Sequence, residues 1–501
     1  MLDIQDRSLV AKTRSRIGRF FSFPTLLVAV LLASPFFSSS NVWRGAPILR
    51  DPDIWWHMRN AETLLDTHHF ITTDTYSFTT RGQHWIDPEW LAEIPYYLGF
   101  HLGGERGLFF VMLGAFECII LGVLLLAIRR SRDFKAAYVA TWITVLLAVI
   151  NFGPRTVLFG WICFVAELLI LQAFQKNRLY LWLLVPLFAL WINLHGSWMI
   201  GFVFFVLYAA SGLVEGSWGS ITAQRWTPAQ MRQLTAVGLA STAALFVNPY
   251  GWRLVVYPFD MAFQQKLGVS VGEEWQSVNF HFSNGKIFFT VLAGLALLSL
   301  LRRRRWSLQE LLFALMAVYS GLSYVRFLFL AGIVLCPIIA AEIAALPALM
   351  SDSKRNRPML NAALIALLWS IVFHRFPANA ALQSGIETDF PSGAFRRLST
   401  FDSQARVFNA YFYGGYMIWN TRNIPTFIDS RTDIFEHHGV LHDYVRAIDI
   451  EDTLGMLDKY RIQYVFFPKE DAVVYLLQHT SGWKVNYDDG NAVILERVRS
   501  L

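Results

Sequence analysis

The sequence has 501 residues, of which 54% are hydrophobic, 15% are aromatic and only 16% are charged. Soluble globular chains carry roughly 25% charged residues, so this composition excludes a cytosolic enzyme or a disordered scaffold and indicates a protein embedded in lipid. The formal net charge of +6 is not gathered in one patch or stripe, which argues against a nucleic-acid-binding protein.

Dense basic clusters separate the apolar runs of the chain. They are Lys12 to Arg19, Arg129 to Arg132, Lys176 and Arg178, Arg302 to Arg305, and Lys354 to Arg357. Cytoplasmic loops of membrane proteins carry an excess of Lys and Arg. The clusters therefore mark the cytoplasmic side and place the basic N-terminus, residues 1–19, on that side.

The first apolar run, residues 20–37, follows this basic N-terminus. It can be read as a cleavable secretory signal or as an uncleaved anchor. We favour the anchor, because the later spans need its orientation to keep every basic cluster on one side of the membrane. Residues 38–105 then form a first external loop.

About eleven apolar runs are long enough to cross the bilayer core, which takes about 20 mainly apolar residues. After the first, they cover about 107–128, 136–150, 157–174, 180–192, 198–214, 233–248 and 287–301, two runs flanking Ser323 to Arg326, and 359–373. A second long external loop covers 248–285. We therefore predict an α-helical polytopic transmembrane domain over residues 20–374, with its two long loops on the same side.

The composition changes after about residue 375. Short β-type runs at 406–411, 425–429, 464–467 and 492–496 alternate with helical stretches at 439–447, 451–460 and 470–480. This alternation predicts a small α/β domain over residues 375–501. Span parity places it on the extracytoplasmic side, and no Walker-type phosphate loop indicates direct use of ATP.

The first external loop opens with two carboxylates, which are followed by paired indoles, a histidine and an arginine. Asp51 and Asp53 can hold a divalent cation, or one of them can act as a general base toward a hydroxyl or amide. Trp55 can stack on a sugar, and His57 and Arg59 are further candidates for substrate binding. The alternative is that one of the carboxylates caps the following helix and that the tryptophans anchor it at the interface.

Asp87 and Glu89 precede a second aromatic stretch in the same loop. Glu89 is a candidate for substrate binding. We favour the alternative here, a capped helix that lies on the membrane surface.

Ionisable residues at membrane depth usually mark a pathway or a site. Three ionisable residues lie at the external ends of predicted spans: Arg155, His195 and Arg326. Tyr324 lies close to Arg326 in the sequence. Three such groups on one face, with no acidic neighbour in sequence, are typical of a site for an anion such as phosphate. Taken singly, each can also be an interfacial cap or a snorkelling anchor.

Two further acidic positions have open interpretations. Glu273 and Glu274 in the second external loop can join Asp51 and Asp53 as metal ligands, or they can simply be solvated. Asp429 and Arg431 can reach the acceptor across the membrane surface, or they can form a local ion pair, which we favour slightly.

The sequence resembles the GT-C superfamily of integral-membrane glycosyltransferases, which includes protein O-mannosyltransferases, the aminoarabinose transferase and the catalytic subunits of oligosaccharyltransferases. The resemblance rests on Asp51-Pro52-Asp53-Ile54-Trp55-Trp56-His57-Met58, Asn193-Leu194-His195-Gly196, Asn248-Pro249-Tyr250-Gly251, Glu274-Trp275 and Phe427-Ile428-Asp429-Ser430-Arg431. It implies a catalytic or near-catalytic acid in the first loop and a donor sugar on polyprenyl phosphate or diphosphate. The C-terminal region lacks a tryptophan-rich acceptor motif, which argues against recognition of a peptide sequon.

We therefore expect a glycosyltransferase of a bacterial inner membrane that moves a sugar from a polyprenyl-phosphate or diphosphate carrier to an extracytoplasmic protein, lipid or polysaccharide. The lipid phosphate is itself the leaving group, so no nucleotide is needed, and a divalent cation such as Mg²⁺ or Mn²⁺ is a candidate cofactor. The alternatives are a transporter or flippase of a lipid-linked or anionic substrate and a non-catalytic membrane assembly factor. We favour the enzyme, because the chain shows no related halves of the kind that transporters often have.

Overall fold

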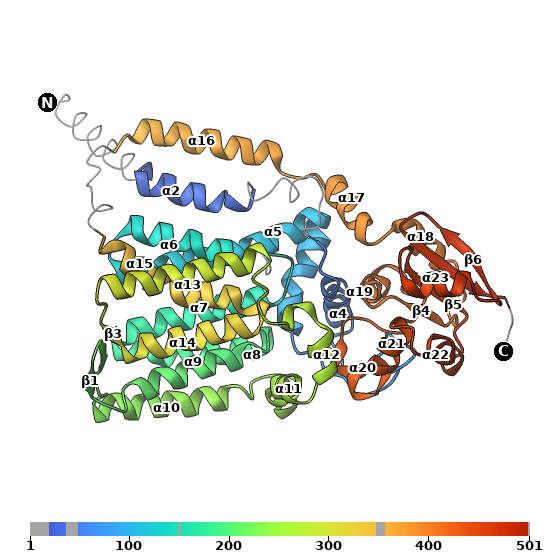
Figure 1. Ribbon diagram of the computed structural model, residues 1–501, viewed down its shortest axis with the longest axis horizontal. Helices are drawn as coiled ribbons and strands as arrows, with labels where there is room; N and C mark the ends of the chain where they lie inside the picture. The colour runs from blue at the N-terminus through green and yellow to red at the C-terminus, as the bar shows by residue number, and fades with distance from the viewer. Residues whose placement is uncertain (1–19, 37–48, 149–151, 347–355, 499–501) are drawn as a thin grey trace.

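The computed structural model describes residues 20–36, 49–148, 152–346 and 356–498. The predicted cytoplasmic N-terminus (1–19), the basic pair Lys354 and Arg355 and the start of the first predicted loop (38–48) lie outside these residues. The described chain is mostly helical. A bundle of long helices lies beside a smaller C-terminal segment, residues 379–498 (Figure 1).

Apolar helices form the bundle. They are α2 (Phe23–Leu32), α5 (Trp90–Ser131), α6 (Phe134–Leu147), α7 (Val157–Phe174), α8 (Leu184–Leu194), α9 (Trp198–Ser211), α10 (Pro228–Ala244), α13 (Ser283–Leu301), α14 (Leu308–Ser323), α15 (Leu328–Ala344) and α16 (Pro358–Arg375), with short 3-10 turns η1 (Ser34–Phe36), η3 (Arg178–Leu183) and η5 (Val325–Phe327). Among the described residues, 5 helices are long and apolar enough to cross a membrane, and shorter apolar helices accompany them. The protein is therefore a multi-pass membrane protein, and its number of spans stays a prediction.

Helix α5 begins earlier than the predicted span at 107–128, because the aromatic stretch before that span is also helical. The two parts meet at Gly104, whose φ of 60° and ψ of −143° interrupt the helix. Glycine adopts this backbone conformation without a Cβ clash. The first part of α5 thus corresponds to the predicted interfacial helix, and its start brings Glu89 to the end of the bundle.

Local sequence signals fix the starts of several bundle helices. The Asp133 side chain accepts a hydrogen bond of 2.7 Å from the Ala136 N–H at the start of α6. At the start of α10, Thr227 and Gln230 form a reciprocal capping box. Such caps satisfy backbone N–H groups that have no partner inside the helix.

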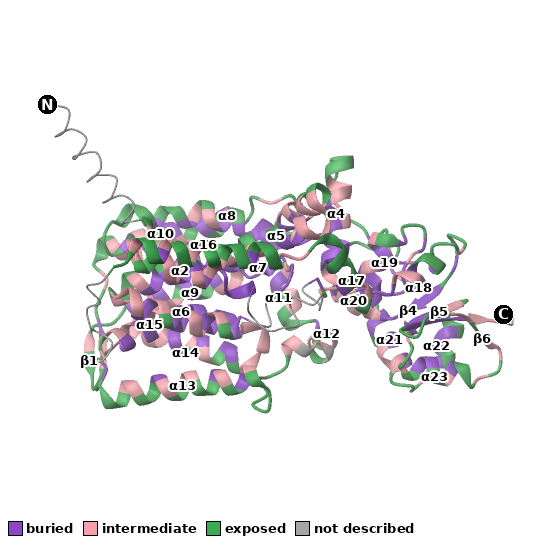
Figure 2. Ribbon diagram, turned by 90° about the horizontal axis from the view of Figure 1, so that it is seen from above, coloured by how far each residue is buried: buried purple, intermediate pink, exposed green. Residues whose placement is uncertain are grey.

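Helix α15 lies in the centre of the bundle and is buried over most of its length, whereas α13 and α16 are largely exposed (Figure 2). Helices α2 and α16 lie side by side (Figure 1), and the Asn361 side chain of α16 donates a 2.8 Å hydrogen bond to the Phe21 carbonyl. Exposed apolar surface of this kind is the expected lipid-facing side of a membrane bundle.

One end of the bundle carries a small sheet of three strands, β1 (Gly216–Trp218), β2 (Ile221–Ala223) and β3 (Trp306–Ser307), in that order. Strand β2 pairs with β3 in parallel, with Ile221 opposite Trp306. This pairing ties the loop before α10 to the basic cluster Arg302 to Arg305. The opposite end carries α4 (Asp53–Thr67), α11 (Trp252–Phe263), α12 (Lys266–Val271) and η4 (Glu273–Trp275), next to the C-terminal segment (Figure 1).

The C-terminal segment contains a sheet of four strands in the order β4-β5-β7-β6. Its elements are α17 (Asn379–Asp389), α18 (Ser392–Leu398), β4 (Val407–Asn409), α19 (Tyr411–Asn420), α20 (Thr432–His437), α21 (Val440–Ile448), α22 (Thr453–Lys459), β5 (Tyr464–Pro468), α23 (Ala472–Gln478), β6 (Trp483–Asp488) and β7 (Ala492–Arg497). Strands β4 and β5 are parallel, and the two pairs that involve β7 are antiparallel.

The predicted strand at 425–429 is wrong. Of this run, Thr426 alone forms a β-bridge, and it pairs with Ser77 of the first external loop. The Phe427 N–H donates to the Asn409 side chain at 2.8 Å instead of to a strand. A side chain therefore satisfies the backbone here, and the run becomes a loop that contacts the first external loop.

Candidate functional site

The acidic motif of the first loop lies at the start of α4. Asp51 Oδ1 accepts a 2.9 Å hydrogen bond from the Asp53 N–H at the first residue of the helix, whereas the N-cap position itself is Pro52, which makes no side-chain cap. The other Asp51 oxygen, Oδ2, lies 2.7 Å from Arg155 Nε. Asp51 therefore both holds the Asp53 backbone and forms an ion pair with Arg155, which lies in the loop before α7.

Arg155, Glu274 and Arg326 form a continuous chain of charges. Glu274 Oε2 lies 2.7 Å from Arg155 Nη1, and Glu274 Oε1 lies 3.0 Å from Arg326 Nη1. The Arg326 guanidinium also covers the ring of Trp275 at 4.1 Å. The predicted cations thus converge, but acidic side chains from distant loops bridge them, contrary to the expectation from neighbouring sequence. These contacts hold down the pKa of Glu274, although burial alone would raise it.

Asp53 lies beside this chain of charges with a carboxyl that is incompletely paired. Its Oδ1 is buried and has no hydrogen-bond partner among the described residues. Burial and then the charge of Asp51 raise the pKa of Asp53 to about 7, while Ser430 and Arg155 lower it. A carboxyl with a pKa near neutrality can exchange a proton at physiological pH.

A second polar cluster surrounds Glu89. His57 Nε2 lies 3.5 Å from Glu89 Oε2, His195 Nε2 lies 3.2 Å from Glu89 Oε1, and the Thr156 hydroxyl also donates to this carboxyl. Burial raises the pKa of Glu89 to about 8. It lowers the pKa of His195 to about 3 and that of His57 well below its usual range. Both histidines are therefore neutral, and His195 contacts Glu89 instead of joining the two arginines.

This cluster extends to residues that were not predicted as site residues. Glu93 Oε1 lies 2.5 Å from His57 Nδ1, and Asn60 donates to both Asp87, at 3.1 Å, and Glu93, at 3.3 Å. Glu93 follows Glu89 by four residues, so the two share one helix face. That spacing was the sequence signal that could have identified Glu93.

Asp429 and Arg431 form a buried ion pair. Arg431 Nε and Nη2 each lie 2.7 Å from an oxygen of Asp429, and Nη2 also lies 2.9 Å from Asp74 Oδ1. The side chains of all three residues are 0% exposed. The guanidinium covers the ring of Trp85 at 4.8 Å. This geometry favours the local ion pair over contact with an acceptor, and it clamps the first external loop to the C-terminal segment.

Three other predicted substrate-binding residues have structural partners in the described chain. Trp55 is 2% exposed and packs edge-on against Tyr416 at 4.8 Å, so it offers no free ring face to a sugar. Arg59 pairs with Glu62 one turn further along α4. Tyr324 packs edge-on against the Trp275 ring at 5.7 Å and thereby supports the surface on which Arg326 lies.

The predicted metal ligands do not form a ligand set in the described chain. No group of three or more His, Cys, Asp or Glu side chains suited to a metal occurs among the described residues. The Arg155 guanidinium lies between Asp51 and Glu274, where a bridging cation would lie. The structure does not describe the side chain of Glu273.

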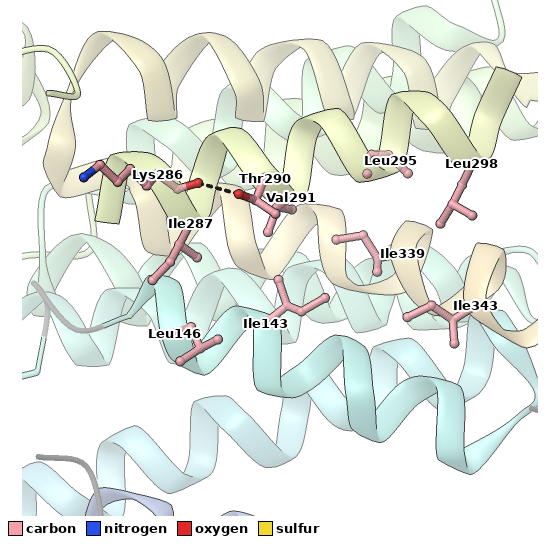
Figure 3. A pocket seen from close by; sticks show the side chains of 11 residues that line it. Ile143, Leu146, Lys286, Ile287, Thr290, Val291, Leu295, Leu298, Ile339 and Ile343 are labelled. Atoms are coloured by element: carbon pink, nitrogen blue, oxygen red, sulfur yellow. Dashed lines mark hydrogen bonds between the residues drawn. The ribbon is translucent and has the colours of Figure 1, made fainter. Parts of the chain in front are cut away.

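An apolar groove of about 470 Å³ lies elsewhere, between α6, α13 and α15 (Figure 3). Its walls are mainly aliphatic, with Lys286 at one end, and it contains none of the predicted site residues. It offers no arrangement for proton transfer, so the chemistry of the protein is expected at the carboxylate end of the bundle.

No protein-family model and no curated protein matches the sequence. Solved structures do match. The Archaeoglobus fulgidus oligosaccharyltransferase, tethered with an acceptor peptide that contains the NVT sequon, has a TM-score of 0.51 and 13% identity, covering 95% of this chain and 74% of that one. ArnT from Cupriavidus metallidurans in the apo state has a TM-score of 0.51 and 13% identity, covering 93% of this chain and 97% of that one. The chain therefore has the GT-C fold that these integral-membrane proteins share.

Proposed function

We propose that the protein is a membrane glycosyltransferase that moves a sugar from a polyprenyl-phosphate or diphosphate carrier to an extracytoplasmic acceptor. The observation that carries this proposal is the Asp53 carboxyl, whose pKa is raised to about 7 and which lies next to Asp51, the end of a chain of charges that contains two arginines. A base and a phosphate-binding group side by side are what glycosyl transfer from a lipid phosphate requires. The fold supports the same class of reaction.

Asp53 is proposed as the general base. Its deprotonated carboxylate accepts the proton of the acceptor hydroxyl or amide as the acceptor atom attacks the anomeric carbon. Asp51 is bound by Arg155 and acts as a positioning residue, because its Oδ1 holds the Asp53 backbone N–H. The chain thus assigns different roles to the two acids of the motif.

Arg155 and Arg326 are proposed to receive the departing phosphate. Glu274 bridges the two guanidiniums at 2.7 and 3.0 Å, and a phosphate oxygen can take the place of this carboxylate because arginine binds both groups with the same geometry. As the bond between C1 and the phosphate oxygen breaks, its electron pair stays on the phosphate, where the arginines stabilise the negative charge. A single displacement of this kind inverts the anomeric centre.

A requirement for Mg²⁺ or Mn²⁺ is a separate proposal, and no step here depends on it. Arg155 already neutralises Asp51 and Glu274, so a divalent ion would have to displace a guanidinium before it could bind the same oxygens. We place the reaction on the extracytoplasmic face of a bacterial inner membrane, in line with the distribution of basic clusters. The acceptor is a protein, a lipid or a polysaccharide.

The test uses purified protein with radiolabelled polyprenyl-phosphate sugars and membrane extracts as acceptors. Label is expected to move covalently to an acceptor, and Asp53→Asn is expected to lower the rate by about 10² to 10⁴, the usual contribution of a general base. Asp402→Asn is the matched control, because Asp402 is exposed in the C-terminal segment.

Wild-type turnover in a folded Asp53→Asn protein would exclude Asp53 as the base, and the same result for Asp51→Asn would remove the whole first-loop motif. Movement of the labelled lipid across vesicles without any covalent product would point to a transporter instead.

A further inference from the structure

A cavity of about 1430 Å³ lies at the basic end of the bundle. Its lining comes from the ends of α5 and α7, the start of α14, the middle of α15 and the chain around β2. This end carries β1 and β3, whereas α4 and its carboxylates lie toward the C-terminal segment (Figure 1). The cavity is therefore separate from the proposed transferase site.

Cations from three separate parts of the chain meet at this cavity. They are Arg129, Arg130, Arg132, Lys176 and Arg305. Among the residues that line the cavity, Glu310 is the one carboxylate, and Arg130 and Arg304 already bind it at 2.6 and 3.0 Å. The other four cations form no ion pair with any residue that the structure describes. Their charge is available to an anionic ligand.

The wall of the cavity is held in place by a buried ion network. Arg304 is 5% exposed and binds both Glu342 and Glu310, and its guanidinium covers the Trp306 ring at 4.3 Å. Trp306 in turn pairs with Ile221 in the small sheet. These contacts fix the backbone of the segments that carry Arg130 and Arg305, so two parts of the basic rim are held at a set separation.

The inner part of the cavity is apolar. Leu168 lies six positions before Phe174, the last residue of α7, so the wall reaches on the order of 9 Å into the bundle by the helical rise. Val334 and Ile338 of the central helix α15 line the same cavity. A soluble anion has no apolar part to pack against such a wall, whereas a phospholipid carries a phosphate next to an acyl chain. Basic pockets between membrane helices are known to suit anionic head groups.

We propose that this cavity binds an anionic phospholipid from the leaflet that the basic clusters face, with its phosphate among the rim cations and an acyl chain along the apolar wall. Bound lipid joins the ends of α5 and α7 to the middle of α15, so it stabilises the folded bundle. The site is distinct from the donor site, and its occupancy does not require the transferase reaction.

The test compares phosphatidylglycerol with phosphatidylcholine on the purified full-length protein, by native mass spectrometry and by thermal stability in mixed micelles. Phosphatidylglycerol is expected to remain bound and to raise the melting temperature, and phosphatidylcholine is not. A basic residue near an anionic head group contributes about 1 kcal/mol, so the double variant Arg129→Gln with Arg132→Gln is expected to bind about 30-fold more weakly. The matched control is Arg178→Gln with Arg303→Gln, which removes the same charge from two exposed positions outside the lining.

Equal losses in the two double variants would overturn the proposal, because they would show general attraction to a basic surface. Equal stabilisation by glycerol phosphate would also overturn it, since a soluble anion would then suffice. The wild-type comparison of the two lipids does not depend on the folding of any variant, and equal binding of both lipids would exclude a site for anionic lipid.

Discussion

Replacing Glu274 by Gln is expected to tighten the binding of polyprenyl phosphate. In the free protein the Glu274 carboxylate lies 2.7 Å from Arg155 and 3.0 Å from Arg326, so an incoming phosphate has to displace it. A hydrogen bond to a charged group contributes roughly 1.5 to 3 kcal/mol. Because the Glu274 side chain is 26% exposed and the phosphate replaces its contacts, we take the net competition to be near the lower end of the range for one such bond. Loss of the competing charge is therefore worth about 2 kcal/mol, or about a 30-fold lower Kd.

The assay is titration of the purified protein with a polyprenyl phosphate and with the corresponding uncharged polyprenol. Glu62→Gln is the matched control, because Glu62 also lies between two arginines, Arg59 and Arg422, but away from the site. The polyprenol is expected to bind both variants as it binds the wild type. An unchanged or higher Kd for the phosphate in Glu274→Gln would refute the assignment of Arg155 and Arg326 to the phosphate.

Four further predictions address charge and proton occupancy. If Asp53 is the base, turnover rises with pH through about 7, the pKa of its carboxyl, and a rate–pH profile without this limb would contradict that role. Folding raises the pKa of Glu89 from an ordinary 4.5 to about 8, so the folded state favours the protonated carboxyl. The stability that this contributes is fully present below about pH 4.5 and is lost as the pH rises through 8. Glu89→Gln should therefore flatten the melting temperature between pH 5 and 9, whereas parallel curves would show no such linkage. Arg431→Met leaves two buried carboxylates without their cation and is expected to cost about 3 to 5 kcal/mol, measured by thermal unfolding. Arg446→Met, at a partly exposed arginine whose acidic partners are more exposed, should cost far less. Turnover is expected to survive EDTA, because Arg155 supplies the countercharge, and activity restored only by Mg²⁺ or Mn²⁺ would show the opposite.

Hydropathy predicted the bundle helices well where the apolar signal was continuous. The run at 157–174 forms α7, Val157–Phe174, with the predicted bounds. The first part of α5 was predicted as a separate interfacial helix, and what hydropathy did not show is that it joins the span at Gly104. Strand β6 was missed. It pairs with β7 alone at the edge of the sheet and carries a bulge between Val485 and Tyr487.

The candidate site was predictable in its cations and not in their partners. Arg155 and Arg326 stood out because arginine is rare at membrane depth. Their partner Glu274 lies more than a hundred residues from Arg155 in the sequence. An ion pair that forms only by tertiary folding leaves no local sequence spacing from which it could be predicted. The fate of Asp429 and Arg431 was open for a similar reason, since burial against Asp74 depends on the packing of two distant segments.

The clamp of Arg431 with Asp74 and Asp429 has a consequence for biosynthesis. Asp74 belongs to a loop that is made early, whereas its cation is made only after the last membrane helix, α16. During translation the Asp74 carboxylate is therefore without its arginine until the C-terminal segment has been made. The Ser430 hydroxyl, which accepts a 3.0 Å hydrogen bond from the Trp56 indole of α4, is also made only then. Nascent chains that stop before this point are expected to be inserted but inactive, so the cell acquires a working catalyst only from completed molecules.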